Sequence, residues 1–265
     1  MSFETIETER DGRVQIIRFN RPEKMNAYIA QMGAEVAQVL REGNADAAAG
    51  AFVVTGNGRA FCAGADISSF AASQASGGSG GGGEPEEGAN NEPFDPTYLA
   101  SSKPIIGAIN GAAVGMGLTW PLLFDVLVAS TKARFSMRFA ALGLTPELGS
   151  TWLLPKIIGV QRAREMMLTG KIYSAEEAHE FGLVHRVVPH EDLLPEAVTL
   201  AAEIAENPTS TLRTVKEMIW NDLVGTDFQK MWKTSTKNFS ASLQSDEAKE
   251  AVNAFVEKRS PQFHD

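Results

Sequence analysis

The sequence is short of cysteine, of positive charge and of long apolar runs. Cys62 is the only cysteine among 265 residues, so an internal disulfide is excluded and a reducing compartment is expected. Lysine and arginine total 24 against 33 aspartates and glutamates, and this net charge of −9 argues against a general nucleic-acid surface. No stretch approaches about 18 clean apolar residues, and the first residues lack the apolar core of a signal peptide. We therefore expect a cytoplasmic protein without nucleic-acid or membrane partners.

One stretch of the chain has too few apolar residues to fold by itself. The sequence at 76–83 is SGGSGGGG, and the acidic run EPEEGANNEPFDP that follows contains no lysine or arginine. Such a segment buries too little surface to offset its backbone entropy, so we predict a mobile loop at about 73–96. A linker between two domains is the alternative. A loop inside one domain is favoured because the segments on its two sides continue one alternating pattern.

That pattern alternates apolar strands with amphipathic helices. It predicts strands at 14–19, 51–56, 104–110 and 124–130, with a helix over 29–40. From about residue 160 the pattern is mostly helical: Ser174 and Glu177 form a capping box, and Gly182 closes that helix. Further helices are predicted at 192–206, 209–223, 227–243 and 246–258. The expected fold class is α/β, with both faces of the sheet covered.

Several familiar catalytic motifs are missing. The spacings of a dinucleotide fingerprint, a phosphate loop and a serine elbow are absent, and the four histidines lack metal-ligand spacing. Instead, two segments rich in small residues, at 57–70 and 109–120, each follow a predicted buried strand. Either turn alone could be an ordinary strand-to-helix connection. Together they could direct two backbone N–H groups at one oxygen, which is the arrangement of an oxyanion hole.

Six segments resemble one family. They are RPEKMNA (21–27), FCAGADI (61–67), KPIIGAINGAAVGMG (103–117), the strand that begins near Asp125, LTGKIYSAEEAHEFGLVHRVVP (168–189) and AFVEKR (254–259). Over nearly the whole chain they are similar to the crotonase, or enoyl-CoA hydratase/isomerase, superfamily. The resemblance implies a ββα spiral core over 1–200 and a C-terminal helical trimerisation region over 201–265. It also implies an acyl-CoA thioester substrate, no separate cofactor and no metal, and a homotrimer or a dimer of trimers.

The resemblance also implies site residues. The oxyanion hole would consist of the N–H groups of Ala65 and Met116. Binding of the coenzyme A part maps to Lys24, Met25, Ala27, Ala63, Gly64, Asp66, Ile67, Gly115 and Gly117, and in the tail to Phe255 and Lys258, which would reach coenzyme A bound by a neighbouring subunit.

The departures from the family pattern are informative. Hydratases of the family carry two glutamates that position and activate water, and the matching positions here are Thr119 and Phe139. With Leu142, these two residues would line an acyl pocket. One acid remains nearby, Glu147. Members that shift a double bond in 3-enoyl-CoA have a lone glutamate in a similar setting, and ring-epoxide phenylacetyl-CoA isomerases have an aspartate there.

Glu147 can be interpreted in two ways. After Pro146 it could be an idle acid in the first turn of a helix, favoured by the helix dipole. Within the family it could be a base, since a carboxylate among apolar side chains loses hydration and binds protons more strongly. We therefore predict an isomerase that converts 3-enoyl-CoA to 2-enoyl-CoA with Glu147 as the base. The alternatives are an enoyl-CoA hydratase, a ring-epoxide phenylacetyl-CoA isomerase, or a non-catalytic relative that binds acyl-CoA or RNA.

Overall fold

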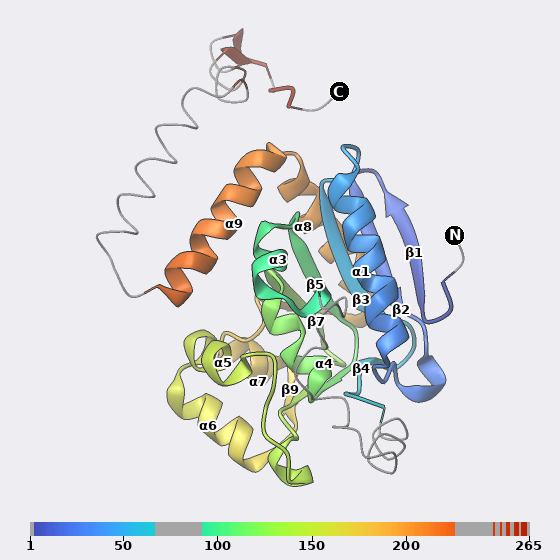
Figure 1. Ribbon diagram of the computed structural model, residues 1–265, viewed down its shortest axis with the longest axis vertical. Helices are drawn as coiled ribbons and strands as arrows, with labels where there is room; N and C mark the ends of the chain where they lie inside the picture. Colours follow the sequence, from blue (N-terminus) through green and yellow to red (C-terminus); the bar gives the residue numbers. More distant parts are fainter. Residues whose placement is uncertain are drawn as a thin grey trace.

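A six-stranded main sheet forms the centre of the computed structural model, which describes residues 3–66, 92–225 and scattered positions between 246 and 263. The strand order is β1-β2-β3-β5-β7-β10, and every neighbouring pair is parallel except β1 with β2 (Figure 1). The strands are β1 (Ile6–Asp11), β2 (Val14–Phe19), β3 (Ala51–Gly56), β5 (Ile105–Ile109), β7 (Val126–Ser130) and β10 (Arg186–Val188).

A second sheet consists of short strands, most of which follow a main-sheet strand directly in the sequence. Its order is β4-β6-β8-β9, where the strands are β4 (Ala60–Cys62), β6 (Ala112–Val114), β8 (Arg134–Ser136) and β9 (Tyr173–Ser174). Each of β4, β6 and β8 directly follows a main-sheet strand, so the chain repeats a main strand and then a short strand before a helical segment. This repetition is the ββα spiral expected from the sequence.

Helices cover both faces of the main sheet. One apolar cluster packs α8 against alternate residues of the central strands, while the other packs α1 and the second sheet against the intervening residues. In Figure 1, α1 lies in front of the sheet and α8 behind it. The helices are α1 (Ala30–Ala45), α3 (Pro96–Ser101), α4 (Met116–Thr119), α5 (Ser150–Ile158), α6 (Val160–Thr169), α7 (Ala175–Glu180), α8 (Leu193–Ala205) and α9 (Thr209–Val224), with short 3₁₀ turns η1 (Pro22–Lys24), η2 (Glu92–Phe94), η3 (Pro121–Leu123), η4 (Ala140–Leu142) and η5 (His190–Asp192).

The main strands agree with the sequence prediction better than the short ones do. The strands predicted at 14–19 and 51–56 have the predicted bounds, and the Ser174–Glu177 capping box is formed. The second sheet was not among the predicted elements, because its strands of two or three residues are too short for an apolar period. The stretch beyond residue 160 also contains β9 and β10, so it is less helical than predicted.

Several predictions concern positions at the edge of the described chain. Most of the loop predicted at 73–96 lies outside the described residues, but its last part contains η2 and the start of α3. The helix predicted at 227–243 lies outside them too, as does most of 246–258. The boundary predicted at 200/201 falls inside α8.

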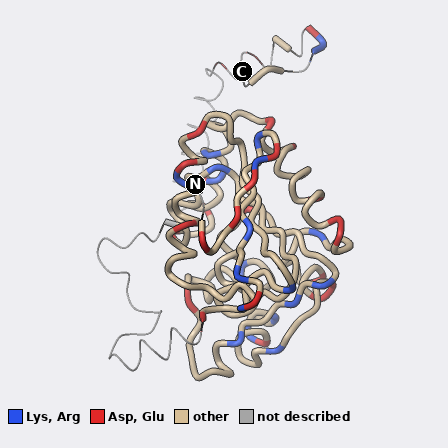
Figure 2. Tube along the Cα trace, turned by 90° about the vertical axis from the view of Figure 1, so that its right-hand side faces the viewer, with Lys and Arg blue, Asp and Glu red and all other residues tan. Residues whose placement is uncertain are grey.

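The charged side chains form no single-sign stripe along the described trace. Figure 2 shows basic and acidic residues interspersed along it. Among the helices that the structure describes, none is both long and apolar enough to cross a bilayer.

A partly buried ion pair links α9 to the start of β7. Lys216 of α9 lies 2.7 Å from the Asp125 carboxylate, and their side chains are 10% and 28% exposed. Asp125 also accepts a hydrogen bond from the N–H of Ile105 at 2.7 Å. Burial lowers the pKa of Lys216 and raises that of Asp125, although each charge opposes the effect on the other. Lys216 also donates to the carbonyl of Lys103 at 3.1 Å, so the pair adds to the packing of Trp220 and Leu223 that holds the helix against the core.

Replacing Lys216 by methionine should therefore destabilise the fold by about 1–2 kcal/mol, between the values for exposed and fully buried pairs, since Asp125 would remain partly buried without its counter-charge. The measurement is urea unfolding at pH 7. The matched control is Lys132→Met, an exposed lysine whose change should stay within about 0.5 kcal/mol. Equal effects of the two substitutions would contradict the role given to the pair.

Candidate active site

Two backbone turns meet where the second sheet ends. β4 and β6 are parallel neighbours, and the turns that follow them touch through glycines. A Cβ atom on Gly117 would lie 1.9 Å from the carbonyl oxygen of Cys62, and one on Gly64 would lie 3.1 Å from that of Val114. Contacts this close explain why small residues occur in both segments.

Each turn leaves one N–H group without a partner. Tyr28 donates to the carbonyl of Gly64 at 2.8 Å and accepts from the N–H of Asp66 at 3.0 Å, so the N–H of Ala65 between them points away from Tyr28. Met116 is the first residue of α4, so its N–H has no acceptor within the helix. Within the described chain, neither N–H donates a hydrogen bond. Two free donors on touching turns are what an oxyanion hole requires.

The loop between β2 and α1 is tied to the first of these turns. Met25 accepts from the N–H of Ala63 at 3.1 Å. The amide of fully buried Asn26 donates to the carbonyls of Asn57 and Ala60 at 2.9 and 2.8 Å. Both Met25 and Asn26 have positive φ angles, 52° and 54°. The structure thus brings together the two segments, 21–27 and 61–66, that carry most of the predicted coenzyme A contacts.

Asp66 is held by an ion pair within this assembly. Its carboxylate lies 3.0 Å from Arg21, and their side chains are 12% and 16% exposed. Arg21 also donates to the carbonyl of Ala27. Asp66 therefore links the segments 21–27 and 61–66 to one another. Ile67, the remaining predicted contact in this segment, lies outside the described residues.

Glu147 lies in the loop before α5, three residues ahead of the helix, and not in its first turn. The side chain is half-buried, and burial raises its pKa. Among the described residues, its carboxylate has no hydrogen bond and no ion pair. The next residue, Leu148, has a φ of 51°, a conformation that costs energy for a residue with a branched side chain and that recurs at functional sites.

Tyr28 connects Glu147 to the first turn. Burial raises the pKa of Tyr28 to about 12, and the charge of Glu147 adds to this effect. The phenol and the carboxylate are therefore near one another, and the backbone of Tyr28 flanks Ala65. Tyr28 is not among the residues predicted from the sequence, because a tyrosine after an irregular loop carries no signal of its own.

An apolar pocket of about 560 Å³ is lined in part by Leu148 and Gly149, the two residues that follow Glu147 in the chain. Among its lining residues are Phe94, Leu123, Leu148, Trp152, Trp220 and Val224. The three residues predicted for an acyl pocket do not line it: Thr119 is fully buried and donates to the carbonyl of Met116 at 3.4 Å, Phe139 is buried, and Leu142 is 61% exposed. The aromatic lining comes from three distant segments, so no local pattern could have identified it.

The two tail candidates do not join this cluster in the described chain. Phe255 lies outside it, and Lys258 is exposed on the C-terminal segment with a φ of 57°. Cys62 is buried, and burial raises the pKa of its thiol to about 11. In the described ranges, no three histidine, cysteine or acidic residues gather in a way that could hold a metal ion.

Comparison with known proteins places this geometry in a family. The model of the enoyl-CoA hydratase/isomerase family matches residues 9–265. The 1,2-epoxyphenylacetyl-CoA isomerase of Escherichia coli K12 is 36% identical over 251 residues, which are 94% of each chain. A probable enoyl-CoA hydratase of Mycobacterium tuberculosis is 35% identical over 99% of each chain. The crystal structure of an enoyl-CoA hydratase/isomerase from Cupriavidus metallidurans has a TM-score of 0.87 at 30% identity, covering 99% of this chain and 97% of the other.

The chain belongs to the enoyl-CoA hydratase/isomerase family and has its crotonase fold. The resemblance seen in the sequence is confirmed.

Replacing Glu147 by glutamine should raise the melting temperature at pH 7.5. Because folding raises the pKa of this carboxyl, the folded state favours its protonated form. The contribution of Glu147 to the free energy of unfolding is therefore most favourable below the ordinary pKa of a glutamate. That contribution is lost as the pH rises through the raised pKa of the folded state. Glutamine removes that loss, so the difference should disappear below about pH 4. Thermal unfolding at both pH values checks this, with exposed Glu203→Gln as the control; a lower melting temperature at pH 7.5 would contradict it.

Proposed function

We propose that this protein is an acyl-CoA isomerase that shifts a double bond from the 3-position to the 2-position of an enoyl-CoA. One observation carries the proposal: Glu147 is a half-buried carboxylate of raised pKa with no partner among the described residues, and it lies near Tyr28, whose backbone flanks one of the two N–H donors that are free in the described chain. A base needs an unengaged carboxylate near the carbon acid, and an enolate needs donors directed at its oxygen.

The reaction uses each of these groups once. The thioester oxygen accepts hydrogen bonds from the N–H groups of Ala65 and Met116, and Glu147 removes a proton from C2. The electron pair of that C–H bond delocalises onto the thioester oxygen as an enolate. The pair then returns through the conjugated system to C4, which takes the proton back from Glu147, and the double bond lies between C2 and C3. Loss of one such donor typically raises the barrier by about 2.7–4 kcal/mol.

Hydration is the less favoured reaction because it needs more acid–base groups than this site offers. The two positions that carry glutamates in hydratases of the family are Thr119 and Phe139, and both are buried without charge. Asp66 is engaged by Arg21. Glu147 alone would have to deprotonate the water and protonate C2.

Replacing Glu147 by glutamine should lower kcat on 3-enoyl-CoA by at least about 100-fold, the lower end of the effect of a positioned base, while leaving KM nearly unchanged. The measurement is formation of the conjugated 2-enoyl thioester by absorbance. The control is Glu203→Gln, which should retain wild-type kinetics. The wild-type kcat/KM should also fall as the pH drops through the raised pKa of Glu147.

A variant that keeps most of the wild-type rate would show that Glu147 is not the base. Faster hydration of crotonyl-CoA than isomerisation by the wild type would favour the hydratase alternative. Binding of acyl-CoA without either reaction would favour a non-catalytic relative.

A second candidate is isomerisation of a ring-epoxide phenylacetyl-CoA. It is favoured by the apolar pocket that Leu148 lines, because that lining also includes Phe94, Trp152 and Trp220 and aromatic side chains pack well against a ring. The 36% identical relative from Escherichia coli is named for this activity.

Trp152→Ala separates the two substrates. If the pocket holds a ring, the substitution should lower kcat/KM for the phenylacetyl-derived substrate by about tenfold or more, and it should change the value for a four-carbon 3-enoyl-CoA by less than about threefold. Trp152→Phe, which restores an aromatic face, should recover most of the loss. Equal losses on both substrates would remove the argument for a ring pocket.

We also propose a cytoplasmic homotrimer or dimer of trimers, in which the tail residues Phe255 and Lys258 reach a neighbour's coenzyme A. The exposed apolar residues Val215 and Ile219 of α9 support an additional interface on that helix, because exposed apolar side chains on one helix favour association.

A further inference from the structure

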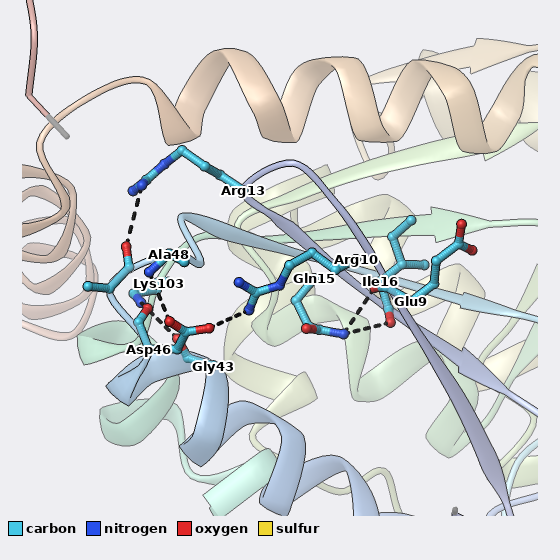
Figure 3. Close-up of polar contacts among 10 residues, drawn as sticks. Glu9, Arg10, Arg13, Gln15, Ile16, Gly43, Asp46, Ala48 and Lys103 are labelled. Atoms are coloured by element: carbon cyan, nitrogen blue, oxygen red, sulfur yellow. Dashed lines mark hydrogen bonds and ion pairs between the residues drawn. The ribbon is translucent and has the colours of Figure 1, made fainter. Parts of the chain in front are cut away.

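Three cations gather at the amino end of the main sheet without a carboxylate partner among the described residues. Arg13 precedes β2, Lys103 precedes β5, and Arg213 lies in the second turn of α9. Lys103 donates to the carbonyls of Gly43 and Asp46 at 2.7 and 2.6 Å (Figure 3). Arg13 and Arg213 likewise donate to backbone carbonyls. These contacts satisfy donors but leave the charges unneutralised.

The nearby acid is already engaged. Asp46 lies 2.7 Å from Arg10 and also accepts from the N–H of Ala48 at 2.9 Å. Lys103 is only 3% exposed. Burial, followed by the charge of Arg213, lowers its pKa to about 8. The charges of Arg13, Lys103 and Arg213 therefore repel one another, and burial of Lys103 limits screening by water.

Two buried donors in this cluster are also unsatisfied. Nη2 of Arg13 and Nε of Arg213 are buried and donate to no group in the described part of the chain. A buried donor without an acceptor is costly and calls for an explanation. A negatively charged acceptor at Arg213 would supply the missing hydrogen bond of its Nε and would reduce the repulsion among the three cations.

A polar pocket of about 300 Å³ opens at two of the three cations. Its lining includes Asn44, Lys103, Thr209 and Arg213, and Arg13 is not among the lining residues. Thr209 is the first residue of the 16-residue helix α9, which has no side-chain cap and no acidic residue in its first turn. The N–H of Thr209 has no acceptor in the described ranges, so the positive end of the helix dipole adds to the two side-chain charges.

We propose that this pocket binds a phosphate-type dianion, either free or as the phosphate group of a small metabolite. An ammonium, a guanidinium and a helix N-terminus are the donors that recognise such a group. The pocket is separate from the candidate active site, because Lys103 precedes β5 and the turn with Met116 follows it. The five residues of β5 alone span about 16 Å.

The first experiment measures binding of inorganic phosphate to the full chain by calorimetry at constant ionic strength set with sodium chloride. Saturable binding with a Kd below about 5 mM is expected. Arg213→Gln should weaken it by about tenfold, since a charge-assisted contact is lost. Arg164→Gln, an exposed arginine of α6, is the matched control and should leave the Kd unchanged. A wild-type Kd above 5 mM, or equal values for Arg213→Gln and wild type, would overturn the proposal.

A second variant tests the helix terminus without removing charge. Thr209→Pro deletes one N–H at a helix position where proline is well tolerated, and the preceding Pro208 already has the extended ψ of 123° that a following proline requires. Binding should weaken about threefold, while thermal stability without phosphate is retained. Unchanged affinity in this variant would exclude a ligand at the start of α9.

Two further measurements test which phosphate compound binds and whether Lys103 contacts it. Glycerol phosphate that binds more tightly than inorganic phosphate would indicate a phosphorylated metabolite, and equal or weaker binding would indicate free phosphate. Sulfate keeps its charge between pH 6.5 and 9.5, so its affinity should fall at high pH as Lys103, which is surrounded by Asp46, Arg10, Arg13 and Arg213, loses its proton. A pH-independent sulfate affinity would remove Lys103 from the site. Each readout is binding, so failure here leaves the isomerase proposal untouched.

Discussion

The close contact between the turns after β4 and β6 is the constraint on which the candidate active site depends. Two N–H groups can share one oxygen only if their backbones approach closely, and here Gly117 packs directly against the carbonyl of Cys62. The parallel pairing of β4 with β6 brings the turns together, and the order of β3 and β5 in the main sheet positions that pair. A side chain at Gly117 would separate the two donors.

The candidate active site contains groups in energetically unfavourable states, and hydrogen bonds and an ion pair around them hold them in place. Glu147 is partly buried without a partner in the described chain, and the residue after it has a positive φ. The neighbouring 21–28 loop also has two positive φ angles, but the buried amide of Asn26 and the Arg21–Asp66 ion pair hold it in place. Conformational strain held in place by many hydrogen bonds is typical of functional sites. Reactive groups there must remain without hydrogen-bond partners.

Much of the main sheet could be predicted from the sequence. The runs at 14–19 and 51–56 have the predicted bounds, because continuous apolar segments bounded by turn residues specify buried strands locally. The capping box at Ser174 is equally local. The two turns with Ala65 and Met116, and the isolated acid Glu147, were also recognisable, because residue types and family resemblance suffice to identify them. The short second sheet was not, since strands of two or three residues have no period to detect.

The sequence by itself determined the fold class, the family and the identity of the candidate base and oxyanion donors. Only the tertiary structure decided that Tyr28 lies near Glu147, that Trp152 and Trp220 line an apolar pocket, and that Lys103 and Arg213 share a polar one. These relations join residues far apart in the chain. They depend on burial and on distance in space, and neither quantity is encoded in the spacing of residues along the sequence.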